Sequence, residues 1–502
     1  MRMIEIKKPF NNAGVKFEVG HAYCLAEDIE GQLRAQYGDA IGMSYPIDNL
    51  LKPYKGEDLS GKRLLTFRTG GIGDIGFLNP VLRWLKHKYP TCQIHAASAC
   101  KQFLENVPEI DCLYDMPFDA ALFNDVDYTV FFQGILESSS EESKKSHAVD
   151  MFFKYFGIDS IQFPAEEKVP RLFFSKKETD WLGKTLTTIG IKEENYVIGV
   201  QMETSAPLRN FPKEKMKMIV ETLAREDKVK VILIGTEQHE SIGHYLRGNN
   251  PNILLATRYD VRQVMTMATR FNLIIAPDSF MIQTAGALDK PLVGLYGPFP
   301  SEVRMKYFKN AIGLDPSVVC SPCFRHDFRA CIKGFPSPCF TQLDTDSVMQ
   351  AVDYLKFKFT GQHFSYMSRI LKEPNLKDIE QYILSADRGI AFFSRYFKHP
   401  NMITVDPNKF TGAEISDLNM VFNREAYPFV VYFNELQPKH INLYNNAKGM
   451  VRPGGYFIVY REEGPEGLFN EVKVDLGKSF TLMYTKYDPA TKSFVVVGKK
   501  AY

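Results

Sequence analysis

Residues 63–90 read RLLTFRTGGIGDIGFLNPVLRWLKHKYP, and this stretch decides the fold of the first half of the chain. The apolar run RLLTFR is followed by a glycine-rich turn and then by apolar residues at helical spacing, as far as Pro90. A strand, a tight turn and a helix in this order are typical of a parallel βαβ sheet. Within the turn, residues 71–76 match G-x-G-x-x-G, the pattern of dinucleotide-binding domains.

A nicotinamide dinucleotide site needs more than these glycines. The pattern also requires an acidic residue about 20 positions further on, which binds the ribose hydroxyls. The second strand, QIHAAS, ends at Ser98 and is followed by Ala99, Cys100 and Lys101, with no acid. Asp74 also lies inside the turn, where it would repel a diphosphate. We therefore interpret Asp74 as a base that faces an uncharged hydroxyl, and a purely structural glycine turn is the remaining alternative.

Composition and charge exclude several classes of protein. The chain has 502 residues, so two to four domains are expected. It carries 61 basic and 59 acidic residues, and a net charge of +2 favours neither nucleic acid nor an anionic membrane. No apolar run approaches the roughly 18 residues of a membrane span, and the first residues lack the apolar core of a secretory signal. We expect a cytoplasmic protein without a transmembrane segment, in the host cytoplasm if the source is viral, with reduced cysteines.

The alternation of short β-branched runs with helical patterns predicts two α/β domains in tandem. We expect a Rossmann-like domain at 61–175 and a second at 176–360, after an N-terminal extension, 1–60, that packs on the first domain. The expected strands are 63–68, 93–98 and 128–133 in the first domain, and 196–201, 228–235, 252–256, 272–277 and 291–297 in the second. Helices are expected between them, for example at 213–226 and 261–271.

Four motifs follow one another along these two domains. The pattern R-x-x-x-x-G-D-x-x-x-x-x-P-x-L-x-x-L-x-x-x-x-P is filled by Arg68, Gly73, Asp74, Pro80, Leu82, Leu85 and Pro90. The other three are RNFPKEKM at 209–216, IIAPDSFMIQTAGALDKPLVGLYGPFPSE at 274–302 and a cysteine-rich stretch at 320–340. Together they resemble the heptosyltransferase family, glycosyltransferase family 9.

This resemblance implies a GT-B fold, in which two Rossmann-like domains face a cleft, and an inverting transferase that needs no catalytic metal. It implies a nucleoside-diphosphate sugar as the co-substrate. Asp74 would be the catalytic base and Arg209 the cationic partner of the diphosphate. Asp278 and Ser279 would cap a helix whose N-terminus attracts the donor diphosphate. Asp278 could also do no more than cap that helix.

Two other site residues each have two possible interpretations. Arg68 would contact the acceptor or a phosphate, in one loop with Gly71 and Gly73, or it would be a structural arginine at a strand end. Glu237, next to Gly235 at the end of a strand, would lie near the donor nucleoside or would be a solvated loop acid.

The family's glycine after Asp-[ST] is Phe280 here, and its histidine is Gln283. Both lie in the donor-binding segment. The pocket around the donor sugar is therefore altered, and ADP-heptose is not assumed to be the donor.

Half of the eight cysteines lie close together, namely Cys320, Cys323, Cys331 and Cys339, with His326 among them. In a reduced compartment this arrangement suggests a structural zinc that holds a loop. The spacing is irregular for a zinc ribbon, so unligated thiols or a disulfide remain open.

The last block, 373–502, resembles a class I methyltransferase domain. The resemblance includes a second strand that ends in Asp406 and a later VRPGGYFIVY strand. The cofactor loop retains only Gly389, and Arg388 and Ile390 would obstruct adenosylmethionine. We therefore expect a degenerate, smaller Rossmann-like α/β domain that binds a partner or an acceptor, with active methylation as the alternative.

The leading hypothesis is an inverting glycosyltransferase whose acceptor is a lipopolysaccharide or another surface glycan. A hydroxylated base of viral DNA is an alternative acceptor, although it would require an electropositive groove with aromatic residues. A binding module without activity is the competing class. Loss of Asp74 or Arg209 would favour that module, and both residues are present.

Overall fold

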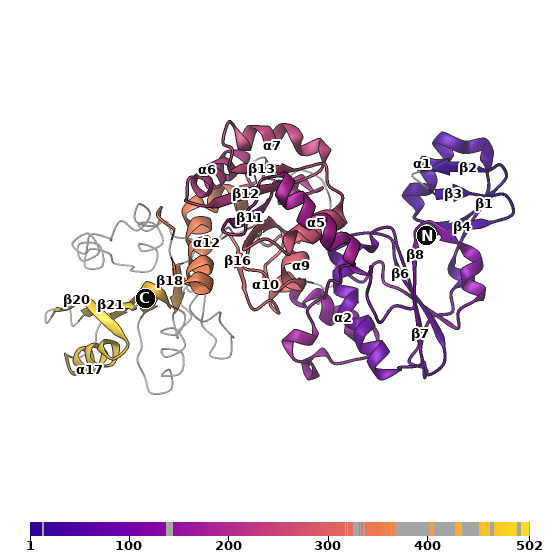
Figure 1. The fold of residues 1–502 in the computed structure, drawn as a ribbon. Coiled ribbons are helices and arrows are strands. Elements are labelled where there is room, and N and C mark those ends of the chain that lie inside the picture. Colours follow the sequence, from indigo (N-terminus) through magenta and orange to yellow (C-terminus); the bar gives the residue numbers. More distant parts are fainter. Residues whose placement is uncertain are drawn as a thin grey trace. The chain divides into compact units, whose positions relative to one another are not determined.

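The computed structural model consists of two compact units (Figure 1). It describes residues 1–12, 15–136, 144–316, 318, 320–324, 331, 333–334, 337–362, 364–366, 402–405, 427–433, 451–461, 466–488 and 493–500. The first unit comprises Met1–Lys213, Asp227–Asp315 and Cys320–Phe335, and the second comprises Glu214–Glu226, Pro316–Val319 and Pro336–Tyr502. Within these described ranges, no helix is both long enough and apolar enough to cross a membrane.

The first domain of unit 1 is built on a four-stranded parallel sheet. Its strands are β6 (Arg63–Arg68), β7 (Gln93–Ser98), β8 (Cys112–Asp115) and β10 (Tyr128–Phe131), in the order β10-β6-β7-β8. The three predicted strands are confirmed, and β8 was not predicted. The order reverses beside β6, and ligands of parallel sheets bind at the carboxyl ends of strands next to such a reversal. Helix α2 (Ile72–Lys88) follows β6 and buries its predicted apolar stripe in the domain core.

The second domain of unit 1 has six parallel strands in the order β13-β12-β11-β14-β15-β16. They are β11 (Tyr196–Gln201), β12 (Val229–Ile234), β13 (Ile253–Ala256), β14 (Leu273–Pro277), β15 (Leu292–Leu295) and β16 (Ala311–Leu314). All five predicted strands are confirmed, and β16 was missed. The order reverses between β11 and β14, and the loops after these two strands contain Arg209 and Asp278.

Four helices of this domain bear on the site. They are α5 (Lys176–Thr188), α8 (Val261–Ala268), α9 (Phe280–Ala287) and α10 (Glu302–Met305). A further helix, α7 (Glu240–Arg247), follows β12. A capping box between Ser175 and Glu178 fixes the start of α5.

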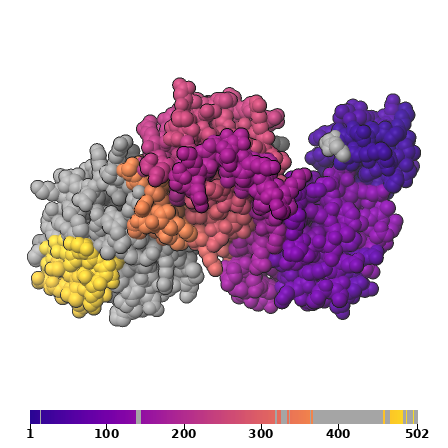
Figure 2. Space-filling model, in the orientation of Figure 1, coloured from indigo at the N-terminus to yellow at the C-terminus, as the bar shows by residue number. Residues whose placement is uncertain are grey.

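The two domains of unit 1 share apolar contacts. Met265 of α8 is fully buried in the core cluster of the first domain, and Phe280 packs against the core clusters of both domains. In Figure 2, the purple and magenta segments accordingly form one packed surface. This shared core keeps α8 and α9 against the first domain.

The N-terminal residues form a sheet that the sequence did not predict. Strands β1 (Arg2–Ile6), β4 (Ala22–Leu25) and β5 (Ile41–Pro46) pair antiparallel, and β9 (Phe118–Asp119) of the first domain adds a fourth strand. A hairpin of β2 (Phe10–Asn12) and β3 (Val15–Phe17) and helix α1 (Glu27–Tyr37) complete it. The pairing of β4 with β9 attaches this extension to the first domain.

Unit 2 contains α6 residues 214–224, α11 (Pro338–Gln342), α12 (Thr345–Thr360) and a five-stranded sheet. Its strands β17 (Met402–Val405), β18 (Tyr427–Phe433) and β19 (Val451–Arg461) are parallel, and β21 (Ser493–Lys500) and β20 (Phe480–Asp488) follow antiparallel. Helix α17 (Glu466–Gly477) precedes β20. Arg388, Gly389, Ile390 and Asp406 lie outside the described residues, so the methyltransferase interpretation stays a prediction.

One buried histidine makes stability depend on pH. His147 is 1% exposed and caps α4 (Ala148–Tyr155), because its Nδ1 accepts a hydrogen bond from the Val149 amide. Its ring packs edge-on against Phe77 and Tyr307. Burial lowers the pKa of His147 from 6.5 to about 3. The imidazole is therefore neutral in the folded chain at pH 5, whereas it is protonated in the unfolded chain.

We expect His147→Asn to reduce the loss of stability in acid, because asparagine keeps a cap acceptor but does not titrate. Since the folded-state pKa is the lower one, His147 costs stability as the pH falls below 6.5. This cost amounts to about 1.4 kcal/mol per pH unit, or roughly 2 kcal/mol at pH 5. Urea unfolding at pH 7 and pH 5 measures it. Equal pH dependence in the variant and the wild type would show that His147 is not the titrating group.

Candidate functional site

The glycines of the 71–76 turn serve backbone geometry and helix packing. Gly71 precedes α2 with a φ of +82°, and a Cβ there would lie 2.4 Å from Asp74 Oδ2. A Cβ on Gly73 would lie 3.5 Å from Phe280 Cα, and one on Gly76 would lie 3.4 Å from Gln283 Cβ. The first glycine therefore lets Asp74 fold back over the turn, and the other two allow α9 to approach α2 closely.

Asp74 lies in the first turn of α2, where the helix dipole favours a negative charge. Its Oδ2 accepts a hydrogen bond from Arg68 Nη2 at 2.9 Å, and 30% of its side chain is exposed. Arg68 is only 1% exposed and also donates to the carbonyls of Gly70, at 3.0 Å, and Phe132, at 2.9 Å. The structure thus favours the structural reading of Arg68, which orients Asp74, over direct contact with an acceptor.

Two guanidinium groups flank Asp278 in the second domain. Arg209 Nη1 donates to the Asp278 carbonyl at 2.9 Å and lies 3.7 Å from Asp278 Oδ2. Arg304 Nε lies 3.9 Å from Asp278 Oδ1, and the Arg304 guanidinium lies over the ring of Phe299 at 5.3 Å. Two cations against one carboxylate leave one net positive charge next to the start of α9. Arg304 was missed by the sequence reasoning, although it follows directly on the 274–302 motif.

The start of α9 has no side-chain cap. Ser279 occupies the N-cap position, but its hydroxyl donates to Gln201 Oε1 at 2.5 Å, and Asp278 is engaged by the two arginines. The expected capping role of these two residues is therefore wrong. Gln201, which ends β11, also donates to the Glu203 carbonyl, and this fixes the orientation of its amide. The first N–H groups of α9 lack the side-chain acceptor that an N-cap residue normally supplies, which is the condition for binding an anion.

Gln283 does not lie in an open donor pocket. It is 2% exposed, packs against Gly73 and Gly76, and donates to the Arg304 carbonyl at 3.3 Å. The close approach of α2 covers Gln283, and its role in binding the donor stays a prediction. We interpret Gln283 as a packing residue between α2 and α9.

The loop after β12 has a tightly packed beginning and an exposed acid. A Cβ on Gly235 would lie 2.7 Å from Met202 Cε and 2.9 Å from His239 Cβ, so only glycine fits there. Glu237 is exposed at the start of the short helix Glu237–His239. His239 faces the loop after β11, with Nε2 at 3.8 Å from Glu203 Oε2. Glu203 and His239 are thus further candidates near a nucleoside, and each lies in the loop that follows a predicted strand.

The described residues of the cysteine cluster do not show a metal site, so the structural zinc stays a prediction. Cys320, Cys323, Cys331 and Cys339 are free thiols, and His326 lies outside the described residues. Within the described part of the chain, no group of three or more His, Cys, Asp or Glu side chains could hold a metal ion. The described residues therefore do not show the tetrahedral arrangement that zinc requires.

The site as a whole brings two helix N-termini together. Helices α2 and α9 are in contact, and a Cβ on Gly73 would lie 3.5 Å from Phe280 Cα. Asp74 and Ser279, the neighbours of these two residues, therefore belong to the two helix starts that approach each other. The second domain supplies a net positive charge and uncapped N–H groups, and the first supplies a partly exposed carboxylate. Such an arrangement can bind an anionic leaving group beside a base.

Part of the chain is similar to a known protein family. Residues 134–331 match the model of glycosyltransferase family 9 (heptosyltransferase). A solved structure of a glycosyl transferase family 9 protein from Veillonella parvula is 17% identical, with a TM-score of 0.50, and the match covers 60% of this chain and 99% of that one. Comparison with curated proteins gives no match.

Two further solved structures are similar at lower scores. ADP-heptose lipopolysaccharide heptosyltransferase II of E. coli is 15% identical over 59% of this chain and 99% of its own, with a TM-score of 0.47. The iron-containing dodecameric glycosyltransferase TibC of E. coli is 14% identical over 62% and 78%, with a TM-score of 0.44.

Proposed function

We propose that this chain is an inverting glycosyltransferase, because residues 134–331 match the model of glycosyltransferase family 9 and the chain has the GT-B fold with two Rossmann-like domains. It moves a sugar from a nucleoside diphosphate to an acceptor hydroxyl. The observation that supports this proposal is the close approach of α2 to α9, where a Cβ on Gly73 would lie 3.5 Å from Phe280 Cα, because the first turn of α2 contains Asp74 and α9 starts without a side-chain cap.

The reaction follows from the two sides of this contact. Asp74 accepts the proton of the acceptor hydroxyl, and the hydroxyl oxygen forms a bond to the anomeric carbon. The bond from that carbon to the diphosphate oxygen breaks on the opposite face, which inverts the configuration. The departing diphosphate gains negative charge, and Arg209, Arg304 and the N–H groups at the start of α9 stabilise it.

The acceptor is proposed to be a hydroxyl of a surface glycan such as a lipopolysaccharide, in keeping with the family's heptosyltransferase description. The donor sugar is left open, because Phe280 and Gln283 occupy positions where the family has glycine and histidine. Phe280 packs between the two domain cores. Its side chain thus fills space that a glycine would leave empty.

A thermal-shift screen with nucleoside diphosphates and their sugars tests the proposal. A ligand that binds only the folded chain raises the melting temperature of the chain. At a concentration of a hundred times the dissociation constant, the ligand adds about 2.7 kcal/mol to the free energy of unfolding. We expect at least one nucleoside diphosphate to do so, and nucleoside monophosphates to have a smaller effect. A complete screen without any shift would contradict the proposal.

Gly71→Ala is expected to reduce turnover at least tenfold, because the new Cβ would lie 2.4 Å from Asp74 Oδ2 and the φ of +82° disfavours alanine. The strained backbone should also cost about 1–2 kcal/mol of stability. Release of nucleoside diphosphate from a donor sugar, with water as acceptor, measures turnover without knowledge of the glycan.

Gly70→Ala is the matched control for this variant. A Cβ there meets nothing within 4 Å, and Gly70 has no positive φ. The control should keep wild-type turnover and stability. Equal turnover in the two variants would show that the position of Asp74 does not limit the rate.

A further inference from the structure

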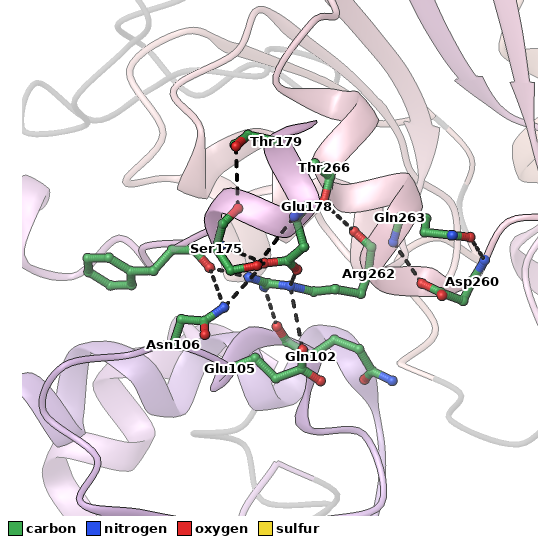
Figure 3. Close-up of polar contacts among 11 residues, drawn as sticks. Gln102, Glu105, Asn106, Ser175, Glu178, Thr179, Asp260, Arg262, Gln263 and Thr266 are labelled. Atoms are coloured by element: carbon green, nitrogen blue, oxygen red, sulfur yellow. Dashed lines mark hydrogen bonds and ion pairs between the residues drawn. The ribbon is translucent and has the colours of Figure 1, made fainter. Parts of the chain in front are cut away.

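Arg262 of α8 joins the two domains of unit 1 through several contacts (Figure 3). Its Nη1 donates to the Gln102 carbonyl at 2.9 Å, and its Nη2 donates to the Phe173 carbonyl. Its Nε donates to Glu178 Oε1 and lies 3.6 Å from Glu105 Oε2. The guanidinium also lies over the ring of Phe174 at 4.6 Å, and only 10% of the side chain is exposed.

Glu178 is the anionic partner in this cluster. Its Oε2 accepts hydrogen bonds from the amide and hydroxyl of Ser175 and, at 3.3 Å, from Asn106 Nδ2 of the first domain. Burial acts to raise the pKa of Glu178, but the hydrogen bonds from Arg262 and Ser175 hold it below its ordinary value. Asn106 also donates to the Phe173 carbonyl. The segment 173–175, which connects the domains, is thus held from both sides.

A planar guanidinium is needed for these contacts. Nε, Nη1 and Nη2 point in three directions and reach a carboxylate and two carbonyls on separate segments. A lysine ammonium is a single point charge and cannot make all three contacts at once. Because the group is buried, these hydrogen bonds are also protected from solvent screening.

The residues that bind Arg262 are adjacent in the sequence to a residue that packs against α2, the helix that contains Asp74. Phe103 follows Gln102, and its ring lies 3.4 Å from the position of a Cβ on Gly76, in the helix whose first turn contains Asp74. On the other side, α8 contacts α9, whose start binds the diphosphate in the proposed reaction. A shift at Arg262 would therefore change the contact between the starts of α2 and α9.

We propose that Arg262 is a positioning residue that, together with Glu178, sets the spacing between Asp74 and the diphosphate-binding start of α9. This rests on the proposed function. The residues that bind the diphosphate, Arg209, Arg304 and the start of α9, all lie in the second domain. Loss of Arg262 should therefore affect turnover and leave nucleotide affinity unchanged.

The test compares Arg262→Gln and Arg262→Lys with Arg270→Gln. Arg270 is the matched control, since its Nη2 binds three carbonyls, those of Lys192, Glu193 and Asn195, within the second domain. We expect both Arg262 variants to lower the turnover of donor hydrolysis at least tenfold, with nucleoside diphosphate affinity within twofold of wild type. Arg270→Gln should lower the melting temperature and keep wild-type turnover. Glu178→Gln combined with Arg262→Gln should be no slower than the slower single variant.

Hydrogen exchange gives a readout that does not depend on activity. In Arg262→Gln, amides of peptides 70–78 and 278–284 should exchange faster, and in Arg270→Gln they should not. If the wild type hydrolyses no donor, the proposed function fails, and this exchange pattern still tests the positioning role. The positioning role would be overturned by wild-type turnover in Arg262→Gln or by unchanged exchange at both helix starts. It would also be overturned if Arg270→Gln lost turnover in proportion to its loss of stability, because loss of stability alone would then account for the lower rate.

Discussion

We expect Asp74→Asn to lower the turnover of sugar transfer and of donor hydrolysis by at least a hundredfold. This is the largest effect expected of any single substitution. Asparagine keeps the shape of the side chain and an oxygen that can accept the hydrogen bond from Arg68. It cannot accept the proton of the attacking hydroxyl. General-base catalysis typically contributes about 10²–10⁴ in rate, so a loss in this range is expected. Release of nucleoside diphosphate measures the rate.

Two measurements separate loss of the base from loss of the fold. The affinity of Asp74→Asn for a nucleoside diphosphate should stay within about twofold of wild type, because the proposed residues that bind the diphosphate lie in the other domain. The melting temperature should fall, since the buried Arg68 then faces a neutral partner. Asp74→Glu keeps the charge but moves the carboxylate, and it should recover only part of the turnover. Wild-type turnover in Asp74→Asn would exclude Asp74 as the base.

Arg209→Ala should raise the dissociation constant of the donor roughly 10- to 100-fold, since a hydrogen bond between charged groups contributes about 1.5–3 kcal/mol. Arg209 also holds the Asp278 carbonyl at 2.9 Å, so its loss relaxes the loop that leads into α9. Isothermal titration with nucleoside diphosphate measures the change. Turnover at saturating donor should fall less than the affinity.

Two further variants control for charge and for general damage. Arg209→Lys keeps the cation and should bind the donor with intermediate affinity, because lysine cannot bind a phosphate and the Asp278 carbonyl as a fork does. Arg247→Ala removes a basic residue from the last turn of α7 and should bind the donor as the wild type does. Equal affinities in the Arg209 and Arg247 variants would show that Arg209 does not contact the diphosphate.

The sequence predicted the parallel sheets well because buried parallel strands are short runs of β-branched and aliphatic residues. Strand β12, VKVILI, is such a run. The missed strand β8, CLYD, lacks such a run because it is half polar. The N-terminal sheet was missed for another reason, since its fourth strand, β9, comes from residues almost a hundred positions later. Periodicity within a short window contains no information on such pairing.

The candidate site was predictable where one motif carried it and not where distant segments meet. Asp74 and Arg209 could be singled out because each stands in a recognisable local pattern after a strand. The burial of Gln283 could not be foreseen, because it depends on the approach of α2 to α9. The contacts of Arg262 join positions 102, 173 and 178 to 262, and no single segment contains them. The glycines of the turn satisfy a dinucleotide pattern but are explained by helix packing.

A crystal structure with a bound nucleoside diphosphate tests most directly whether the contact between α2 and α9 is the reaction site. We expect the diphosphate to lie at the N–H groups of residues 279–281, within hydrogen-bond distance of Arg209, with Asp74 on the side where the sugar would be attached. A diphosphate bound elsewhere on the chain, or bound at α9 with Asp74 turned away from the terminal phosphate, would contradict this assignment.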